Sequence, residues 1–236
     1  MNADSLRQAL PGRAIRFFQT VDSTMMAAAG QPIGTVIIAD EQTAGVGRHG
    51  HSWHSEAASG IYCSVVLKPT PLLTLALGLA TAEAITLSTG IGCDLRWPND
   101  VMVGGRKAAG ILVQLVNGSA IGGIGINVNH TEFPAQLAPE ATSLRLQAGR
   151  EFSREDILLA LLPAVENFAE MDNQSILRLF TKASSYAAGR RVVVAQPAGP
   201  IRGVTAGLDP SGYLVVRKDD GTETLVLAGG IRAAGT

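Results

Sequence analysis

The chain has 236 residues, enough for one large domain or for a main domain with a small second one. Its 19 basic and 20 acidic side chains give a formal net charge of −1, and charged residues make up only 17% of the sequence. This balance argues against a basic protein that binds nucleic acid mainly through phosphate contacts. A hydrophobic fraction of 46% argues equally against a disordered acidic chain.

The cysteine content and the apolar stretches indicate where the protein resides. Cys63 and Cys93 lie in apolar runs and are too few for a four-sulfur metal site, so we interpret them as buried free thiols in a reducing compartment. Residues 1–16 lack the long apolar region of a signal peptide. The stretch 72–87 is interrupted by Glu83 and is shorter than the ~20 residues that span a bilayer, so it predicts a buried helix. We expect a cytoplasmic protein without a membrane partner.

The first ninety residues mix strands and helices. Three runs rich in β-branched residues predict strands: 15–21, 35–39 and 61–67. A short helix is expected to begin at residues 22–24 and to end before Gly30, and a second one covers 72–88. Residues 41–59 are polar and show no periodic spacing of apolar residues, so we expect a loop. A loop of this length inside a domain is usually functional.

Strands with glycine turns dominate the middle of the chain. The predicted strands are 94–97, 101–103, 107–116 and 120–129. Asn117-Gly118 is the strongest hairpin signal in the sequence. Two helices follow, at 153–171 and 174–182, and Ser153 with Asp156 forms a capping pattern at the start of the first.

The last part of the chain predicts a different architecture. Four short strands with glycine-containing turns between them are expected: 191–195, 201–206, 213–217 and 222–227. Regular short strands of this kind suggest a small barrel. The predicted class is α+β, with a mixed or antiparallel sheet domain over residues 1–186 and an SH3-like β-barrel over residues 187–236.

The segment Gly45-Val46-Gly47-Arg48-His49-Gly50 matches the G-x-G-x-x-G pattern of dinucleotide-binding proteins. That pattern must follow a strand at once and open a helix. Here residues 40–44 intervene after the strand, and residues 51–55 show no helical period. We therefore reject dinucleotide binding. The glycines still allow the backbone to approach a ligand closely, with Arg48 as a fixed charge, and a flexible surface loop is the alternative.

Three of the four histidines lie in this same loop and raise the question of a metal site: His49, His51 and His54. His130 is far away in the sequence, and Glu56 is the only carboxylate at ligand spacing. We interpret the histidines as part of a solvated or phosphate-facing loop and predict no metal site made of protein side chains alone.

Lys107 begins a strand whose next residues are small or apolar, so its ammonium group needs a partner. Asp100, in the segment Arg96-Trp97-Pro98-Asn99-Asp100, lies across the Gly104-Gly105 turn and is the expected partner. A purely structural salt bridge is the alternative. Further on, the glycines of residues 122–129 would make room on one side of a strand for a flat ligand or a close backbone.

Together these segments resemble biotin protein ligases. The resemblance rests on five motifs in order: Ser23-Thr24; Gln42-Thr43-Ala44-Gly45-x-Gly47-Arg48-x-Gly50-x-x-Trp53; Trp97-Pro98-Asn99-Asp100; Lys107-x-x-Gly110-Ile111-Leu112; and Gly123-Ile124-Gly125-Ile126-Asn127-Val128-Asn129. It continues through the C-terminal barrel and covers nearly the whole chain. It implies a catalytic domain of the biotin/lipoate ligase type. Because the first motif begins at Ser23, we expect a monofunctional ligase without a DNA-binding domain and without a DNA partner.

The family implies a two-step reaction. Biotin reacts with Mg-ATP to give biotinyl-5′-AMP, and a lysine of a carrier protein then takes the biotinyl group. The resemblance thus implies ATP and Mg²⁺ as cofactors, biotin as substrate and a biotin carboxyl carrier protein, commonly the acetyl-CoA carboxylase subunit, as partner. A homodimer is compatible with it. No covalent enzyme nucleophile is required, so positioning and charge stabilisation must carry the rate.

The resemblance also assigns residues to roles. Arg48 and Lys107 would act at the junction of carboxylate and α-phosphate, while Asp100 would orient Lys107 or the metal, or help to deprotonate the incoming lysine. The predicted biotin-binding residues are Ser23, Thr24, Met25, Gln42, Val46, Gly47, Arg48, Lys107, Gly110, Leu112, Gly123 and Gly125. The predicted ATP-binding residues are Arg48, His51, Trp53, Asn99, Lys107 and Asn127, with Trp53 stacked on adenine.

Four positions depart from the family pattern. Val46 and His51 stand where arginines are common, Met25 replaces an asparagine, and Arg96 replaces a lysine. Of these, His51 would weaken phosphate binding or make it depend on pH. Two other functions stay open: a lipoyl or octanoyl transferase of the same fold, and a biotin or nucleotide sensor without catalysis.

Overall fold

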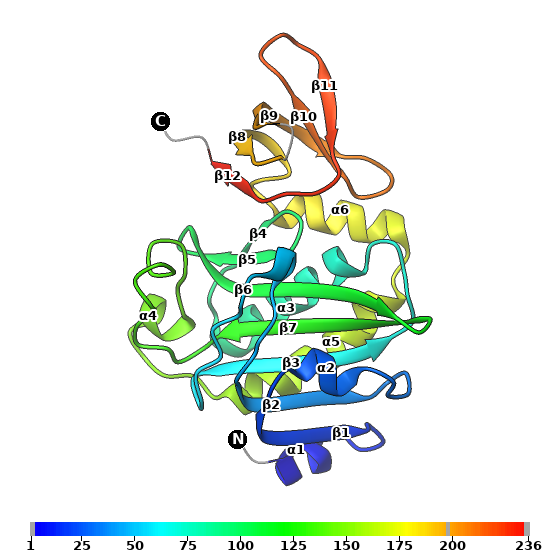
Figure 1. The fold of residues 1–236 in the computed structure, drawn as a ribbon, viewed down its shortest axis with the longest axis vertical. Helices are drawn as coiled ribbons and strands as arrows, with labels where there is room; N and C mark the ends of the chain where they lie inside the picture. Colours follow the sequence, from blue (N-terminus) through cyan, green and yellow to red (C-terminus); the bar gives the residue numbers. More distant parts are fainter. Residues whose placement is uncertain (1–2, 197–198, 234–236) are drawn as a thin grey trace.

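Two β-sheets organise the chain in the computed structural model, which describes residues 3–196 and 199–233 (Figure 1). The first sheet has seven strands in the order β1-β2-β3-β7-β6-β5-β4. Its strands are β1 (Ile15–Val21), β2 (Val36–Gln42), β3 (Gly60–Leu67), β4 (Asp94–Arg96), β5 (Asp100–Val103), β6 (Arg106–Val116) and β7 (Ser119–Asn127). β1 and β2 run parallel and all the other neighbours are antiparallel, which confirms the predicted mixed sheet.

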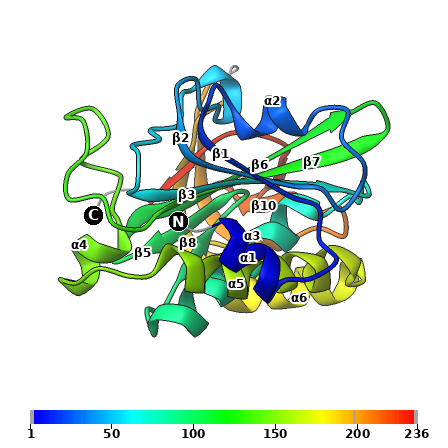
Figure 2. The same cartoon turned by 90° about the horizontal axis from the view of Figure 1, so that it is seen from below.

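Helices cover one face of this sheet and leave most of the other to loops (Figure 2). The covering helices are α1 (Ala3–Ala9), α3 (Leu73–Thr89), α5 (Arg154–Glu170) and α6 (Asn173–Ala183). The short α2 (Thr24–Ala28) lies on the opposite face, and α4 (Leu144–Ala148) follows β7. α3 packs against both α5 and β6, and ten of its residues are buried, which confirms the predicted buried helix. α1 and α4 were not predicted, because both are too short to show a clear periodic pattern in the sequence.

Two glycine-containing turns connect the strands that later prove to surround the candidate active site. Asn117 and Gly118 both adopt left-handed φ values, 50° and 80°, as a two-residue hairpin between β6 and β7 requires. Gly104 and Gly105 do the same between β5 and β6, with φ values of 56° and 75°. Both predicted hairpins are confirmed, and the second, together with a register shift between Val101 and Met102, places Asp100 directly opposite Gly110.

The second sheet contains five antiparallel strands in the order β11-β10-β9-β8-β12. They are β8 (Ala188–Val194), β9 (Ile201–Leu208), β10 (Leu214–Arg217), β11 (Glu223–Val226) and β12 (Ile231–Ala233). The four predicted strands are present, and an antiparallel sheet of this size fits the expected SH3-like class. β12 was not predicted because three residues after Gly230 carry little pattern, yet Ile231 is buried and pairs with Val194. The division of the chain at residues 186 and 187 stays a prediction.

Trp97 links the two sheets. Its indole is 3% exposed, and its Nε1 donates a hydrogen bond of 2.8 Å to the carbonyl oxygen of Gly212 in the turn before β10. Gly212 has a φ of 83°, and a Cβ there would lie 2.5 Å from Leu72 at the start of α3. The close approach of this turn to the first sheet therefore depends on one glycine and one indole.

Replacing Trp97 with Phe should weaken this contact. The substitution keeps an aromatic ring but leaves the buried carbonyl of Gly212 without its donor, so we expect the free energy of unfolding to fall by about 1–3 kcal/mol. Urea titration followed by circular dichroism measures the loss. Tyr213→Phe, at a neighbouring residue that is 38% exposed, is the control. Equal stability of Trp97→Phe and the control would contradict the role given to this bond.

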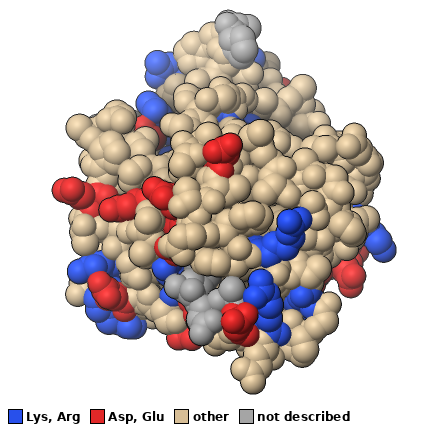
Figure 3. Space-filling view, turned by 60° about the horizontal axis from the view of Figure 1, so that its bottom comes forward, with Lys and Arg blue, Asp and Glu red and all other residues tan. Residues whose placement is uncertain are grey.

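The surface is largely neutral on the face shown in Figure 3, where acidic and basic side chains lie close to one another between wide areas without charge. Among the described residues, several ion pairs join oppositely charged side chains, for example Arg13 with Glu166 at 2.7 Å. None of the described helices combines the length and the apolar character that crossing a bilayer would require.

Candidate active site

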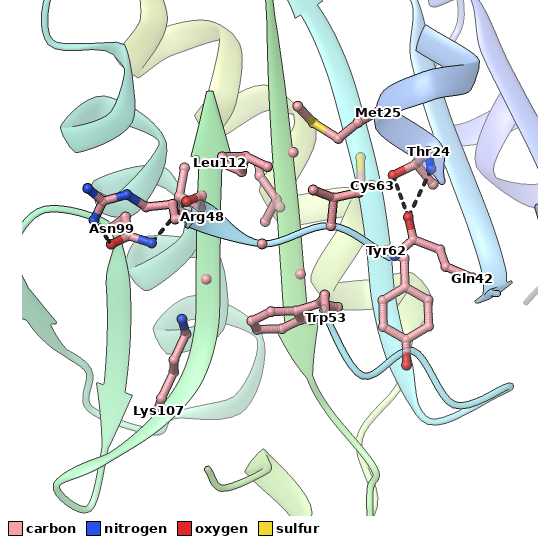
Figure 4. Close-up of a pocket in the computed structure, with 17 residues that line it drawn as sticks. Thr24, Met25, Gln42, Arg48, Trp53, Tyr62, Cys63, Asn99, Lys107 and Leu112 are labelled. Atoms are coloured by element: carbon pink, nitrogen blue, oxygen red, sulfur yellow. Dashed lines mark hydrogen bonds between the residues drawn. The ribbon is translucent and has the colours of Figure 1, made fainter. Parts of the chain in front are cut away.

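A cavity opens on the sheet face that carries α2, between the loop after β2 and strands β3, β6 and β7 (Figure 4). Its volume is about 50 Å³. Most of the predicted site residues line it: Thr24, Met25, Gln42, Val46, Gly47, Arg48, Trp53, Asn99, Lys107, Gly110, Leu112, Gly123 and Gly125. Folding thus brings five separate sequence motifs to one place.

Four predicted site residues do not line this cavity. Ser23 is buried as the residue before α2, and its hydroxyl has no hydrogen-bond partner among the described residues. His51 is exposed on the loop. Asp100 pairs with Lys107 but does not itself line the cavity. Asn127 is 4% exposed and donates from Nδ2 to the carbonyl oxygen of Thr142, so its amide holds the segment before α4.

The structure adds lining residues that the sequence analysis missed: Tyr62, Cys63, Ile111 and Ile124. Tyr62 and Cys63 belong to β3, which pairs with β7 so that Tyr62 stands opposite Gly125. Tyr62 and Cys63 could have been identified as site residues from their position on the strand that pairs with the glycine-rich strand β7. Burial raises the pKa of the Cys63 thiol to about 12, so this thiol stays protonated and unreactive at neutral pH.

The loop after β2 is a tight hairpin. The amide of Gly47 donates to the carbonyl of His51 at 2.6 Å, and the amide of Trp53 donates to the carbonyl of Gly45 at 2.8 Å. The turn between them contains His49 and Gly50, both with left-handed φ values. No α-helix begins after the glycines, which agrees with the rejection of a dinucleotide-binding loop. The hairpin instead carries Arg48 and Trp53 toward the sheet.

Trp53 rests on two glycines of the sheet. A Cβ on Gly110 would lie 2.7 Å from the indole, and a Cβ on Gly125 would be closer still. In Figure 4 the ring lies between Tyr62 and Lys107, and the Lys107 ammonium is 5.3 Å from its centroid. Replacing Gly110 or Gly125 by any larger residue would therefore push the indole out of this position.

The glycines of β7 do not all share one side, contrary to the expectation from the sequence. Gly123 and Gly125 face the cavity, where added Cβ atoms would meet Met25 and Trp53. Gly122 faces the helices, and a Cβ there would lie 2.5 Å from Leu77 of α3. Alternation along a strand explains the difference, because neighbouring residues point to opposite faces. One glycine serves helix packing and the other two serve the site.

Asn99 holds the guanidinium of Arg48. The Arg48 Nη1 donates to the Asn99 Oδ1 at 2.9 Å, and the Asn99 Nδ2 donates to the carbonyl of Ile111 at 3.1 Å. Burial lowers the pKa of Arg48, and the charge of Asp100 opposes that shift. An arginine with such a shift still carries its charge at neutral pH. The amide of Asn99 therefore fixes a positive charge at the cavity.

Asp100 pairs with two cations. Its Oδ1 lies 2.6 Å from the Lys107 Nζ, and its Oδ2 lies 2.8 Å from the Arg96 Nη2. Burial by itself would raise the pKa of Asp100, but the charges of Lys107 and Arg96 outweigh it and lower the pKa. The expected Lys107–Asp100 pair is thus present, and Arg96, a departure from the family pattern, keeps the cationic contact.

Neutral polar groups occupy another part of the cavity. The backbone amide and the hydroxyl of Thr24 both bond to the Gln42 Oε1, at 2.9 and 3.1 Å. The Thr24 hydroxyl also lies 2.8 Å from that of Ser64, and the Gln42 Nε2 donates to the Ser55 hydroxyl at 2.9 Å. This network ties α2 to β2, β3 and the loop end. Met25 and Leu112 add an apolar end to the same cavity (Figure 4).

Comparison with known proteins assigns the chain to a family. Residues 12–130 match the biotin/lipoate A/B protein ligase family, and residues 188–230 match the biotin protein ligase C-terminal domain. The chain is 34% identical over 223 residues to the biotin–[acetyl-CoA-carboxylase] ligase of Mycobacterium tuberculosis, across 89% of this chain and 82% of that protein. This chain belongs to the biotin protein ligase family. The two matched segments correspond to the two β-sheets.

Other members of the family support the same assignment. The biotin protein ligase of Aquifex aeolicus in complex with biotin and ATP superposes with a TM-score of 0.84 and 31% identity, over 93% of this chain and 99% of that one. The bifunctional ligase/repressor BirA of Bacillus subtilis is 32% identical over 213 residues, which cover 84% of this chain. The match spans 66% of the length of that bifunctional protein.

The position of the Trp53 indole against the sheet can be tested by the substitution Gly125→Ala. The added methyl group collides with the indole, so we expect the free energy of unfolding to fall by about 1–3 kcal/mol and the Trp53 fluorescence to shift. A Trp97→Phe background leaves Trp53 as the remaining one of the two tryptophans. Gly92→Ala is the matched control, since a Cβ there meets nothing within 4 Å. An unchanged spectrum in Gly125→Ala would place the indole elsewhere.

The charge of Asp100 predicts a pH dependence. Because the folded-state pKa is lowered, the ionised carboxylate stabilises the fold above the ordinary pKa of about 4, and this stabilisation is lost as the pH falls through the lowered value. We expect Asp100→Asn to be less stable than the parent by about 2 kcal/mol at pH 7, allowing for the partial exposure of Lys107.

The difference between parent and Asp100→Asn should shrink as the pH falls below about 4. Urea titrations at a series of pH values measure it. Glu83→Gln, which removes an exposed carboxylate of α3, is the control and should show no such convergence. A difference that stays constant with pH would mean that the ion pairs of Asp100 do not stabilise the fold.

Proposed function

We propose that this chain is a biotin–[biotin carboxyl-carrier protein] ligase, which activates biotin as biotinyl-5′-AMP and transfers the biotinyl group to one lysine of a carrier protein. The observation that carries the proposal is the pairing, in one cavity, of two positioned cations, Arg48 and Lys107, with an otherwise neutral lining. Such a lining suits an uncharged ring system, and the cations suit the meeting of a carboxylate with a triphosphate. The names of the family members support the same activity.

In the first step, a carboxylate oxygen of biotin attacks the α-phosphorus of ATP. The bond between that phosphorus and the bridging oxygen to the β-phosphate breaks, and diphosphate leaves with the electron pair. Negative charge grows at the α-phosphate during this step. Arg48 and Lys107 act there, and because Asn99 and Asp100 already hold both cations, little reorganisation is needed at the moment of reaction.

In the second step, the neutral ε-amine of the carrier lysine attacks the acyl carbon of the adenylate. The new C–N bond forms as the bond to the phosphate oxygen breaks, AMP leaves with the electron pair, and the nitrogen releases one proton to water. We assign Asp100 to positioning Lys107 rather than to taking the proton of this amine. Two cations lower the pKa of its carboxylate and make it a weak base.

The remaining lining residues would position the two substrates. Thr24 and Gln42 offer neutral donors and acceptors to the ureido ring, with Met25 and Leu112 against its apolar parts. Trp53 is the proposed adenine contact. Because the indole of Trp53 occupies part of the cavity in this structure, biotin would displace side chains of the hairpin that carries Arg48 and Trp53. Closing again, the hairpin would keep water from the anhydride.

The residues present do not form a protein site for Mg²⁺. The described residues that line the cavity include no acidic side chain, and Asp100 is already engaged by two cations. Mg²⁺ prefers carboxylate, phosphate and water oxygens, so the phosphates of ATP would carry it into the site. No step above depends on a protein ligand to the metal.

The setting of the reaction is also a proposal. The two cysteines are free thiols, as is usual for a cytoplasmic protein. The charge balance gives no basis for a nucleic-acid partner, and the partner expected is a biotin carboxyl carrier protein. A homodimer through a free sheet edge stays a prediction, as does the monofunctional character.

A transfer assay tests the function. The protein is incubated with ATP, a biotin carboxyl carrier domain and either labelled biotin or labelled lipoate, and the carrier is analysed by mass spectrometry. We expect biotin on one carrier lysine, together with AMP and diphosphate. Transfer of lipoate alone would identify a lipoyl ligase, and binding of biotin without transfer would identify a sensor; either result would overturn the proposal.

Lys107→Ala should lower the rate of biotinyl-5′-AMP formation at least about 100-fold, because it removes a charge that acts on the transition state. Lys182→Ala, at an exposed position of α6, is the control and should retain the parent rate. Circular dichroism verifies that both variants are folded. A parent-like rate in Lys107→Ala would show that this lysine does not act in the first step.

A further inference from the structure

Folding brings together three potential metal ligands that lie apart in the sequence. One ligand atom each of His54, Glu56 and His130 lies within 4.8 Å of the other two. His54 and Glu56 follow the hairpin of the active-site loop, whereas His130 comes after the end of β7. A backbone hydrogen bond of 2.7 Å from the amide of Asn129 to the carbonyl of Ser59 ties the two segments. The sequence analysis judged His130 too distant to take part, and the structure corrects that.

The hydrogen bonds around His130 determine which of its nitrogens is free. Its ring is 0% exposed, and its Nε2 lies 3.3 Å from the hydroxyl of Tyr62. That hydroxyl donates its own proton to the carbonyl of Glu56 at 2.8 Å, so Nε2 must be the donor to Tyr62. The Nδ1 of the neutral ring therefore carries a lone pair. It is buried and has no hydrogen-bond partner among the described residues.

We propose that His54, Glu56 and His130 bind a divalent transition-metal ion, with Zn²⁺ as the best fit. Two imidazoles and one carboxylate are a donor set that Zn²⁺ accepts, and three protein ligands leave a position for water. The second nitrogen of His130 is held by Tyr62, as ring nitrogens opposite a metal usually are. Mg²⁺ and Ca²⁺ are disfavoured, because both prefer sites made of oxygen ligands alone.

The site would connect to the cavity through two neighbours. Tyr62 lines the cavity and touches both Glu56 and His130, and Trp53 directly precedes His54. A bound ion would fasten the end of the active-site loop to the segment after β7. Zn²⁺ would thereby stiffen the wall of the cavity on the side of Trp53, away from Arg48 and Asn99.

Calorimetric titration of the metal-free full chain with zinc chloride tests the proposal. We expect one ion per chain, and a loss of affinity of about tenfold or more in both His54→Ala and Glu56→Gln. His49→Asn is the matched control, because it removes an imidazole from the same loop and Asn tolerates the left-handed backbone at that position. Excess Mg²⁺ should not compete with zinc.

The melting temperature provides a second measurement, since an ion that binds the folded chain more tightly than the unfolded chain must stabilise the fold. Zinc should raise the melting temperature of the parent and of His49→Asn, but not that of His54→Ala. No binding to the parent, or unchanged binding in His54→Ala, would overturn the proposal; so would a loss of binding in His49→Asn. None of these measurements involves biotin transfer, so their outcome is independent of the proposed activity.

Discussion

The site depends on a pair of glycines that face each other across two strands. Gly110 of β6 and Gly125 of β7 are direct partners in the sheet, and together they leave a hollow that the indole of Trp53 fills. A side chain at either position would occupy the space of the indole. The hairpin turn at Asn117-Gly118 sets the register that brings the two glycines together, and the turn at Gly104-Gly105 joins β5 to the other side of β6. The hollow is thus a consequence of turn chemistry as much as of the two glycines themselves.

The register of β5 against β6 positions the charged side chains. Because Asp100 stands opposite Gly110, its carboxylate lies close to Lys107, three residues before that glycine. Asn99, the neighbour of Asp100, accepts from Arg48 and donates to the backbone of β6. A chain with few charged residues therefore concentrates four of them, Arg48, Arg96, Asp100 and Lys107, around one wall of one cavity. Each cation is held by a polar partner: Arg48 by the amide of Asn99, and Lys107 and Arg96 by the carboxylate of Asp100.

The end of the loop that bears Trp53 is fixed from the opposite side. Tyr62 reaches from β3 to the backbone of Glu56 and to His130, while Ser55 bonds to Gln42. The loop is therefore anchored near its exit, whereas the hairpin turn at His49 and Gly50 is exposed to solvent. Motion needed to admit a ligand would be expected at that turn, where few contacts would have to be broken.

The strands of the first sheet, the buried helix, both glycine hairpins, the Lys107–Asp100 pair and the family resemblance could all be predicted from the sequence. All of these depend on local patterns or on motifs whose members keep their order along the chain. Three features became visible in the folded chain alone: Asn127 supports the segment before α4, Gly122 packs against α3, and Tyr62 lines the cavity.

Only the tertiary structure, too, brought His130 to His54 and Glu56. The physical reason is common to these cases. Whether a residue in a strand faces the ligand or the core, and which distant segment it meets, depends on strand pairing, which links residues far apart in the sequence. Local pattern predicts the pairing of two strands joined by a short turn, but not the pairing of strands that are distant in the sequence, such as β3 and β7.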